Sequence, residues 1–196
     1  MTSTTTRIVA GIAALATAVV LSSCSKSAEH GDHAASSTTT SEQVAAHNGE
    51  DVMFAQMMIA HHQQALDLAA LVPDRSTNPS VVKLATTISG EQQPEITAMK
   101  ALLLQWDVDP ATASGHGGMT MQGMVEDATM AKLDSLKGAE FDTLWLQTMI
   151  GHHQGAIEMA NTEIAKGQST DMITMARNIV TAQQAEIDQM KQMLGG

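Results

Sequence analysis

Hydrophobic residues recur along much of the chain at spacings of three and four, the period of an amphipathic helix. Asn48 and Asn78 are suitable N-cap residues for two of these segments, and Pro73 and Gly167 mark two helix ends. Pro94 falls inside the second segment, where it predicts a kink or a local break. The pattern predicts long helices over residues 48–72, 78–106, 139–166 and 169–194, and a short helix over residues 126–136.

The second half of the chain repeats the first at an offset of 91 residues. The segment MMIAHHQQALDLA matches TMIGHHQGAIEMA, and the match continues without a gap into QQPEITAMK and QQAEIDQMK. Each copy contains two long predicted helices, and two copies are too few for a solenoid. We therefore predict an all-α, up-down four-helix bundle over residues 48–194. It is built from a duplicated helical hairpin, with repeats at residues 48–106 and 139–194 joined by residues 107–138.

The second helix of each copy carries a carboxylate, Glu95 or Glu186, in a stripe that is otherwise mostly apolar. Residues three and four apart lie on one side of a helix, so both carboxylates are expected to point inward. Burying an unpaired carboxylate costs on the order of several kcal/mol unless a partner or a cation compensates. Each carboxylate is therefore expected to have a partner group or a bound cation inside the bundle.

The first helix of each copy carries two adjacent histidines on or beside its buried face, with a methionine one turn earlier. Imidazole, thioether and carboxylate groups in one core indicate a metal site, although Gln92 and Gln183 could satisfy the histidines in a purely structural polar network. No catalytic residue is predicted. The candidate metal ligands are His61, His62, His152, His153, Met58, Met149, Met159, Glu95 and Glu186.

Ligand softness indicates which metal the site would take. Thioether with imidazole favours Cu(I), imidazole with carboxylate suits Cu(II) and Zn²⁺, and a di-iron bundle carries Glu-x-x-His on two helices. No Glu-x-x-His occurs in the predicted helices. Copper is therefore the first choice, with Cu(I) favoured, and silver is expected to substitute for it at the methionines.

The start of the chain predicts export and a lipid anchor. Arg7 and the apolar run over residues 8–21 are typical of a secretory signal over residues 1–23, and Leu21-Ser22-Ser23-Cys24 resembles the bacterial lipobox, whose cysteine is lipidated. An uncleaved anchor is the competing interpretation. Residues 24–47 are small and polar, which predicts a flexible tether that contains His30, His33 and His47. The bundle is therefore expected outside the cell membrane and attached to it through Cys24.

Composition narrows the function classes. The net charge of −11 excludes a nucleic-acid partner, because such proteins cluster Lys and Arg. Fifteen Met with only two Phe, two Trp and no Tyr means that some Met must fill the core, so Met content alone decides nothing. The connection over residues 111–125 is either a glycine linker or a soft-metal capture segment. Its candidate ligands are His116, Met119, Met121 and Met124.

The two His-His motifs, together with GAEFDTLWLQTMIGHHQGAIEMA, resemble family 305 of the domains of unknown function. The resemblance implies a ferritin-like fold and extracytoplasmic copper binding. It places the family's motif on the four paired histidines, with adjoining methionines at Met58, Met149 and Met159. Leu68 stands in the first copy where the second has Met159, so the first site is expected to hold metal less firmly.

The leading hypothesis is a lipid-anchored extracytoplasmic protein that buffers copper, transfers it or confers tolerance, with a copper donor or acceptor protein as partner. One alternative is a redox metalloenzyme that oxidises its bound metal. Another is a scaffold lipoprotein without metal. Affinity is expected to fall below about pH 6.5, where imidazole is protonated. The sequence leaves open whether the repeats share one site and whether the bundle closes alone or as a homodimer.

Overall fold

The structure, a computed structural model, describes residues 46–110 and 121–195, and helices make up most of this part. None of the described helices has an apolar stretch long enough to cross a lipid bilayer. The predicted signal segment, Cys24, His30, His33, His116 and Met119 lie outside the described residues. The helices are α1 (Gly49–Ala70), α2 (Val72–Arg75), α3 (Pro79–Gln105), α4 (Asp127–Ser135), α5 (Gly138–Lys166) and α6 (Thr170–Met193).

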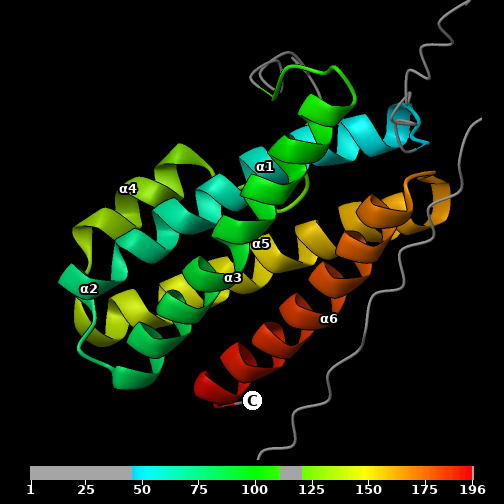
Figure 1. The fold of residues 1–196 in the computed structure, drawn as a ribbon. Coiled ribbons are helices and arrows are strands. Elements are labelled where there is room, and N and C mark those ends of the chain that lie inside the picture. Colours follow the sequence, from blue (N-terminus) through cyan, green and yellow to red (C-terminus); the bar gives the residue numbers. More distant parts are fainter. Residues whose placement is uncertain (1–45, 111–120, 196) are drawn as a thin grey trace, which may run out of the picture. The chain divides into compact units, whose positions relative to one another are not determined.

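Two helical hairpins make the bundle (Figure 1). Helices α1 and α3 form the first hairpin, with the single turn of α2 in their connection, and α5 and α6 form the second. The hairpins meet mainly through α1 and α5, whereas α3 and α6 touch only sparsely, and α4 packs against α5. The prediction of an all-α four-helix bundle built from two hairpins is therefore confirmed.

Side-chain caps fix the helix starts where the sequence predicts them. The Asn48 side chain accepts hydrogen bonds at the first turn of α1, and Asp51 accepts one from the Asn48 backbone N–H at 2.6 Å. Asn78 accepts from the Ser80 N–H at 3.0 Å, and Ser169 caps α6. Each cap satisfies N–H groups that have no partner inside the helix.

Of the two outcomes predicted for Pro94, the local break does not occur. Pro94 does not break α3, which runs through it as one helix of 27 residues. The carbonyl that loses its helical partner there belongs to Gly90, and both residues are exposed, so water can bind it. Pro73 does not end the helical path either, because it sits in the first turn of α2.

A polar layer divides the hydrophobic core into two clusters. Along α1, residues 65–69 belong to one cluster and residues 54–59 to the other, with His61 and His62 between them. Helix α5 shows the same division around His152 and His153. The layer is completed by buried polar side chains of the outer helices, namely Gln92, Gln183 and Glu186. The paired histidines and these polar neighbours therefore lie at mid-height in the bundle, with apolar packing above and below.

Candidate metal centre

Helices α1 and α5 run antiparallel, with equivalent residues of the two repeats meeting at their centres. The Asn48 side chain donates to the Lys166 carbonyl at one end, and the Trp145 indole N–H donates to the Leu68 carbonyl toward the other. Between these contacts lie His61 and His152, which are 91 residues apart. The two hairpins are thus related by an approximate two-fold axis that passes beside this histidine pair.

The rings of His61 and His152 lie against each other, with 3.7 Å between centroids and 35° between planes. Both residues are almost completely buried. Burial lowers the pKa of His61 to about 3, and the charge of neighbouring His62 adds to the shift. Burial, followed by His61, also holds the pKa of His152 far below its usual range. Both rings are therefore expected to stay neutral well below pH 6.5, so a loss of metal affinity through this pair should begin at a lower pH than the usual histidine pKa of about 6.5 suggests.

The second histidine of each pair bonds a carboxylate of the outer helix in its own hairpin. His62 Nε2 lies 2.7 Å from Glu95 Oε2, and His153 Nε2 lies 2.8 Å from Glu186 Oε2. The Glu186 side chain is 8% exposed and the Glu95 side chain 23%, so the second pair is the more enclosed. The two inward carboxylates thus have the partners that their burial requires.

These contacts fix which ring nitrogen carries the proton. The carbonyl of Gln122 lies 3.2 Å from His61 Nε2 and can only accept, so Nε2 donates and Nδ1 of the neutral ring keeps its lone pair. The carboxylates act on His62 and His153 in the same way whenever those rings are neutral. In three of the four histidines, Nδ1 is then the nitrogen free to bind a metal.

Five buried ring nitrogens have no hydrogen-bond partner within the described part of the chain. They are Nδ1 of His61, His62, His152 and His153, and Nε2 of His152. The His61 backbone carbonyl is an acceptor near the His152 ring and acts against the fall in its pKa, but it does not meet hydrogen-bond geometry. Leaving a buried polar atom unpaired costs about 1–3 kcal/mol, so five in one layer require an explanation. Neutral imidazole nitrogens fit a copper or zinc ion. Among the described residues, however, no three His, Cys, Asp or Glu side chains converge as a ready-made metal site.

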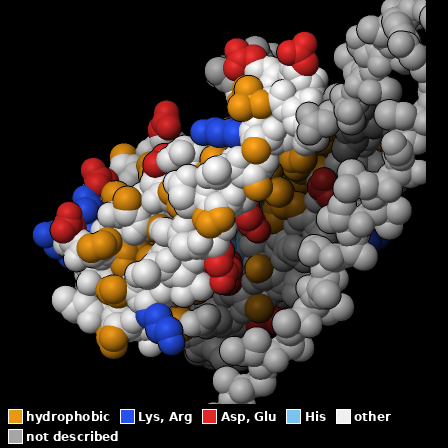
Figure 2. Space-filling view, viewed as in Figure 1, with side chains coloured by type: hydrophobic (Ala, Val, Ile, Leu, Met, Phe, Trp, Pro, Cys, Tyr) orange, Lys and Arg blue, Asp and Glu red, His pale blue; other side chains and the backbone are white. Residues whose placement is uncertain are grey.

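A short segment after the undescribed part of the connection covers the histidine pair. The Gln64 side chain of α1 holds it through two hydrogen bonds to the Val125 backbone, at 2.8 and 2.9 Å. On the α5 side Gly123 has φ +81°, and Gly155 allows close contact, since a Cβ there would lie 2.1 Å from the Gln122 carbonyl oxygen. In the view of Figure 2 almost no histidine surface shows, in keeping with the burial of all four rings.

Comparison with known proteins identifies the family. The model of the family described as "Domain of unknown function (DUF305)" matches residues 51–194. The chain belongs to the DUF305 family. A search of curated proteins finds no match.

Solved DUF305 structures share the fold. A protein of Streptomyces coelicolor that is presumed to be secreted is 33% identical, with a TM-score of 0.68 over 74% of this chain and 92% of its own. A fragment from Deinococcus radiodurans is 33% identical with a TM-score of 0.68, covering 76% and 97%. CopM in its Cu(II)-bound form is 33% identical with a TM-score of 0.64, covering 73% and 94%. CopM is also solved with Cu(I) and with Ag.

The sequence of this DUF305 domain did not indicate one carboxylate near the site, Glu91. Burial, followed by the charges of Glu186 and Glu95, raises the pKa of Glu91. The second repeat has Ala182 at the equivalent position, so the duplication gives no signal for Glu91. The charges of Glu95 and Glu186 therefore reach exposed Glu91, and a cation beside these groups would relieve their repulsion.

The predicted methionine ligands of the DUF305 domain lie in different surroundings. Met58 and Met149 are fully buried, in the two separate core clusters. Met159 is partly exposed and lines a pocket between α1 and α5. Met159 packs against the cluster that contains Met58, but unlike Met58 and Met149 it is partly exposed. His47, expected in the tether, stacks on Trp106 with 4.6 Å between centroids.

Proposed function

We propose that this DUF305 protein binds copper outside the cytoplasm and buffers it or passes it on. The observation that carries the proposal is the polar layer, where four buried imidazoles share five ring nitrogens without hydrogen-bond partners. A purely structural histidine would be expected to satisfy its polar atoms. Low pKa values leave His61 and His152 neutral, the state in which imidazole binds a metal.

The proposed roles differ between the two histidines of each pair. His61 and His152 are proposed to bind the ion together, because their rings lie side by side and both have ring nitrogens without a hydrogen-bond partner. His62 and His153 bind through Nδ1 while Glu95 and Glu186 accept from Nε2 and orient the rings, or the carboxylates bind directly. Met58 and Met149, one turn before His62 and His153 in sequence, are the proposed buried thioether ligands.

Copper is the proposed metal on two grounds. Imidazoles with nearby thioethers and carboxylates suit both oxidation states of copper. CopM, which shares the fold at 31–33% identity, is solved with Cu(I), Cu(II) and Ag. Silver is therefore the proposed substitute for Cu(I) in this protein.

The proposed location is the outer face of the cell membrane, with a lipid on Cys24. Leu21-Ser22-Ser23-Cys24 supports the anchor, and the presumed secretion of the Streptomyces relative supports export. A copper donor or acceptor protein in the same compartment is the proposed partner. Radiolabelled fatty acid should label the expressed protein but not a Cys24→Ala variant. If neither protein is labelled, the proposed lipid anchor is wrong.

The test is titration of the purified chain with Cu(I) and with Cu(II), in a Cys24→Ala background so that a free thiol does not contribute. The variant H61Q/H62Q/H152Q/H153Q keeps side chains able to hydrogen-bond but removes the imidazoles. His47→Gln, on a ring that stacks on Trp106, is the matched control. We expect the control to bind as the parent does and the fourfold variant to lose the copper bound in the polar layer while remaining helical. Equal copper binding by all three would overturn the proposal.

The same preparations separate the rival functions. Stoichiometric uptake without oxygen consumption supports a buffer or carrier, whereas sustained oxygen consumption with Cu(I) or Fe(II) that Glu95→Ala abolishes would indicate a redox enzyme. If the parent binds no metal and the fourfold variant only unfolds more easily, the polar layer is structural. The protein would then be an interaction lipoprotein.

A further inference from the structure

Two groups of methionines in the described part of the bundle differ in their surroundings. Five are completely buried and fill the core, namely Met58, Met99, Met149, Met172 and Met190. Met53, Met57 and Met159 instead line a pocket of about 350 Å³ between α1 and α5. Packing in the core explains the first group, whereas the three pocket methionines are partly exposed, and of these Met159 also packs against one core cluster.

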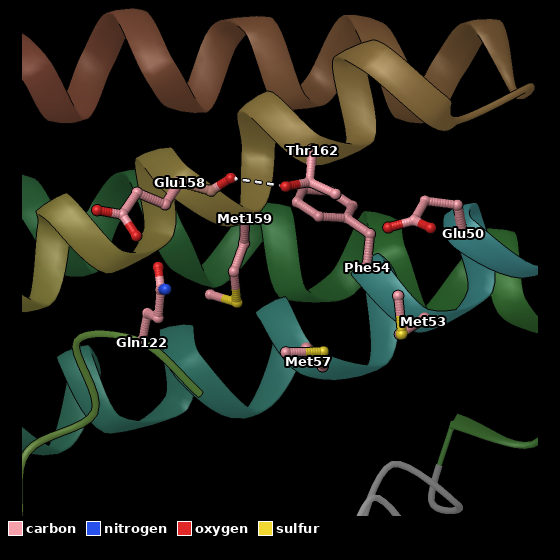
Figure 3. Close-up of a pocket in the computed structure, with 8 residues that line it drawn as sticks. All are labelled: Glu50, Met53, Phe54, Met57, Gln122, Glu158, Met159 and Thr162. Carbon is pink, nitrogen blue, oxygen red and sulfur yellow. Dashed lines mark hydrogen bonds between the residues drawn. The ribbon is translucent and has the colours of Figure 1, made fainter. Parts of the chain in front are cut away.

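The pocket places sulfur atoms between two carboxylates. Figure 3 shows Met159 extending from α5 toward α1, which contributes Met53 and Met57. Glu50 and Glu158 stand toward opposite ends of this row of thioethers. Thioether sulfur is a soft, uncharged ligand that favours a monovalent soft ion, and the carboxylates add the negative charge that attracts a cation.

Duplication does not account for the three thioethers. The equivalent positions of the other repeat hold Leu144, Thr148 and Leu68, none of which has sulfur. That half is also filled, because Trp145 stands where the first repeat has Phe54, is fully buried, and donates to the Leu68 carbonyl. The pocket and its methionines are therefore features of one side of the two-fold arrangement only.

The pocket adjoins the histidine layer without being part of it. Gln122 lines the pocket, and its carbonyl accepts the hydrogen bond from His61 Nε2. None of the four paired histidines lines the pocket. Gln122 would therefore separate an ion held by the methionines from the covered histidine pair.

We propose that Met53, Met57 and Met159 form a separate thioether site that captures Cu(I), or Ag(I) as its mimic, with Glu50 and Glu158 supplying negative charge. The choice of metal rests on the proposed copper-binding function, but the residues do not. Met159 accordingly serves this pocket rather than the histidine layer. Cu(II), which prefers nitrogen and oxygen ligands, does not occupy the site.

The test uses the variant M53L/M57L/M159L in the Cys24→Ala background. Leu keeps the apolar volume and removes the sulfur, so the fold should persist. The matched control is M130L/M175L/M193L, which changes three methionines that are also partly buried but lie elsewhere on the bundle. Circular dichroism confirms the fold, and titrations with Cu(I) under ascorbate, Ag(I) and Cu(II) give the stoichiometry.

We expect M53L/M57L/M159L to lose one equivalent of Cu(I) and of Ag(I) and none of Cu(II), while the control matches the parent. In protein labelled with ¹³C at the methionine methyl groups, Ag(I) should shift three resonances that this variant lacks. An unchanged Cu(I) stoichiometry in M53L/M57L/M159L, or an equal loss in the control, would overturn the site.

The fourfold His→Gln variant keeps the two proposals apart. If the thioether site exists, that variant still binds the equivalent of Cu(I) that M53L/M57L/M159L loses. If copper binding fails only in the histidine variant, the proposed function stands and the thioether site is wrong. If it fails only in the methionine variant, the site stands and the histidine layer is structural.

Discussion

His61 of α1 and His152 of α5 occupy the same position in the two repeats and touch each other, with 3.7 Å between their ring centroids. Two equivalent residues can meet only beside the axis that relates the repeats. Each repeat therefore supplies one imidazole to a single pair. His62 and His153, by contrast, each face a carboxylate of their own hairpin.

This arrangement predicts that the two histidines of the pair act as a unit in binding copper. Either His61→Gln or His152→Gln should remove most of the affinity at the pair, and the double variant should lose little more than either single one, because neighbouring groups are not additive. Competition titration with a chromogenic Cu(I) chelator measures the change. Losses that simply add would show that each repeat holds its own ion.

The covering segment should be sensitive to one methyl group on α5. A Cβ at Gly155 would lie 2.1 Å from the Gln122 carbonyl oxygen, so Gly155→Ala must displace the segment above His61. We expect a loss of roughly 1–3 kcal/mol in the free energy of unfolding, the usual cost of overpacking. Copper exchange should also become faster, which stopped-flow transfer to a chelator would detect.

Gly151 provides the control for this substitution, one turn earlier on the same helix. A Cβ at Gly151 would meet nothing within 4 Å. Gly151→Ala should therefore stabilise the protein by about 0.5–1 kcal/mol, the helix preference of Ala over Gly, and leave copper exchange unchanged. Similar destabilisation by both substitutions would mean that close packing on Gly155 does not hold the segment.

The two His–carboxylate pairs should differ in strength. Glu186→Ala leaves His153 Nε2 without an acceptor in a nearly closed site, at a cost of roughly 1–3 kcal/mol. Glu95→Ala should cost less, because the Glu95 side chain is 23% exposed and water can replace it. Urea unfolding of the metal-free variants gives the comparison, with Gln at each position restoring part of the loss. A larger effect at Glu95 would contradict the greater enclosure of Glu186.

Helix periodicity was sufficient to predict the four helices and the inward direction of Glu186. Such predictions hold because positions three and four apart share a face whatever the partner helix is. The His62–Glu95 and His153–Glu186 contacts also follow the repeat, since each lies within one hairpin. Local spacing thus carries information about faces and about hairpin partners.

The contact between His61 and His152 could not be predicted in the same way. The contact depends on how the two hairpins dock, that is, on the register and direction of α1 against α5. Docking of this kind produces no periodic pattern in the sequence. The cover over the pair rests on Gly155 and on the Gln64 side chain, which is the equivalent residue of the first repeat. The two repeats differ at this position, and that difference was the feature of the sequence that could have indicated the cover.

A second buried group lies at the end of the bundle where α1 begins. Glu163 of α5 is fully buried, and burial, followed by Asp51, raises its pKa to about 8. For Asp51, burial raises the pKa, but N–H groups of Asn48, Ser169 and Gln168, together with Glu163, outweigh it, so the pKa is lowered overall. Between these two pKa values Glu163 is protonated and Asp51 ionised.

This carboxyl pair predicts a stability that falls as pH rises. Between the unfolded pKa of about 4.5 and the folded pKa of about 8, the native state holds a proton on Glu163 that the unfolded state has released. The free energy of unfolding should therefore fall through this window, by at most about 1.4 kcal/mol per pH unit from this group, and level off above it.

Urea midpoints at intervals across this pH window, compared between the parent and Glu163→Gln, isolate the effect. Because Gln cannot ionise, the stability of the variant should change less with pH. Exposed Glu140, changed to Gln, is the control and should follow the parent. Parallel pH profiles for the parent and Glu163→Gln would mean that Glu163 is ionised in the native protein.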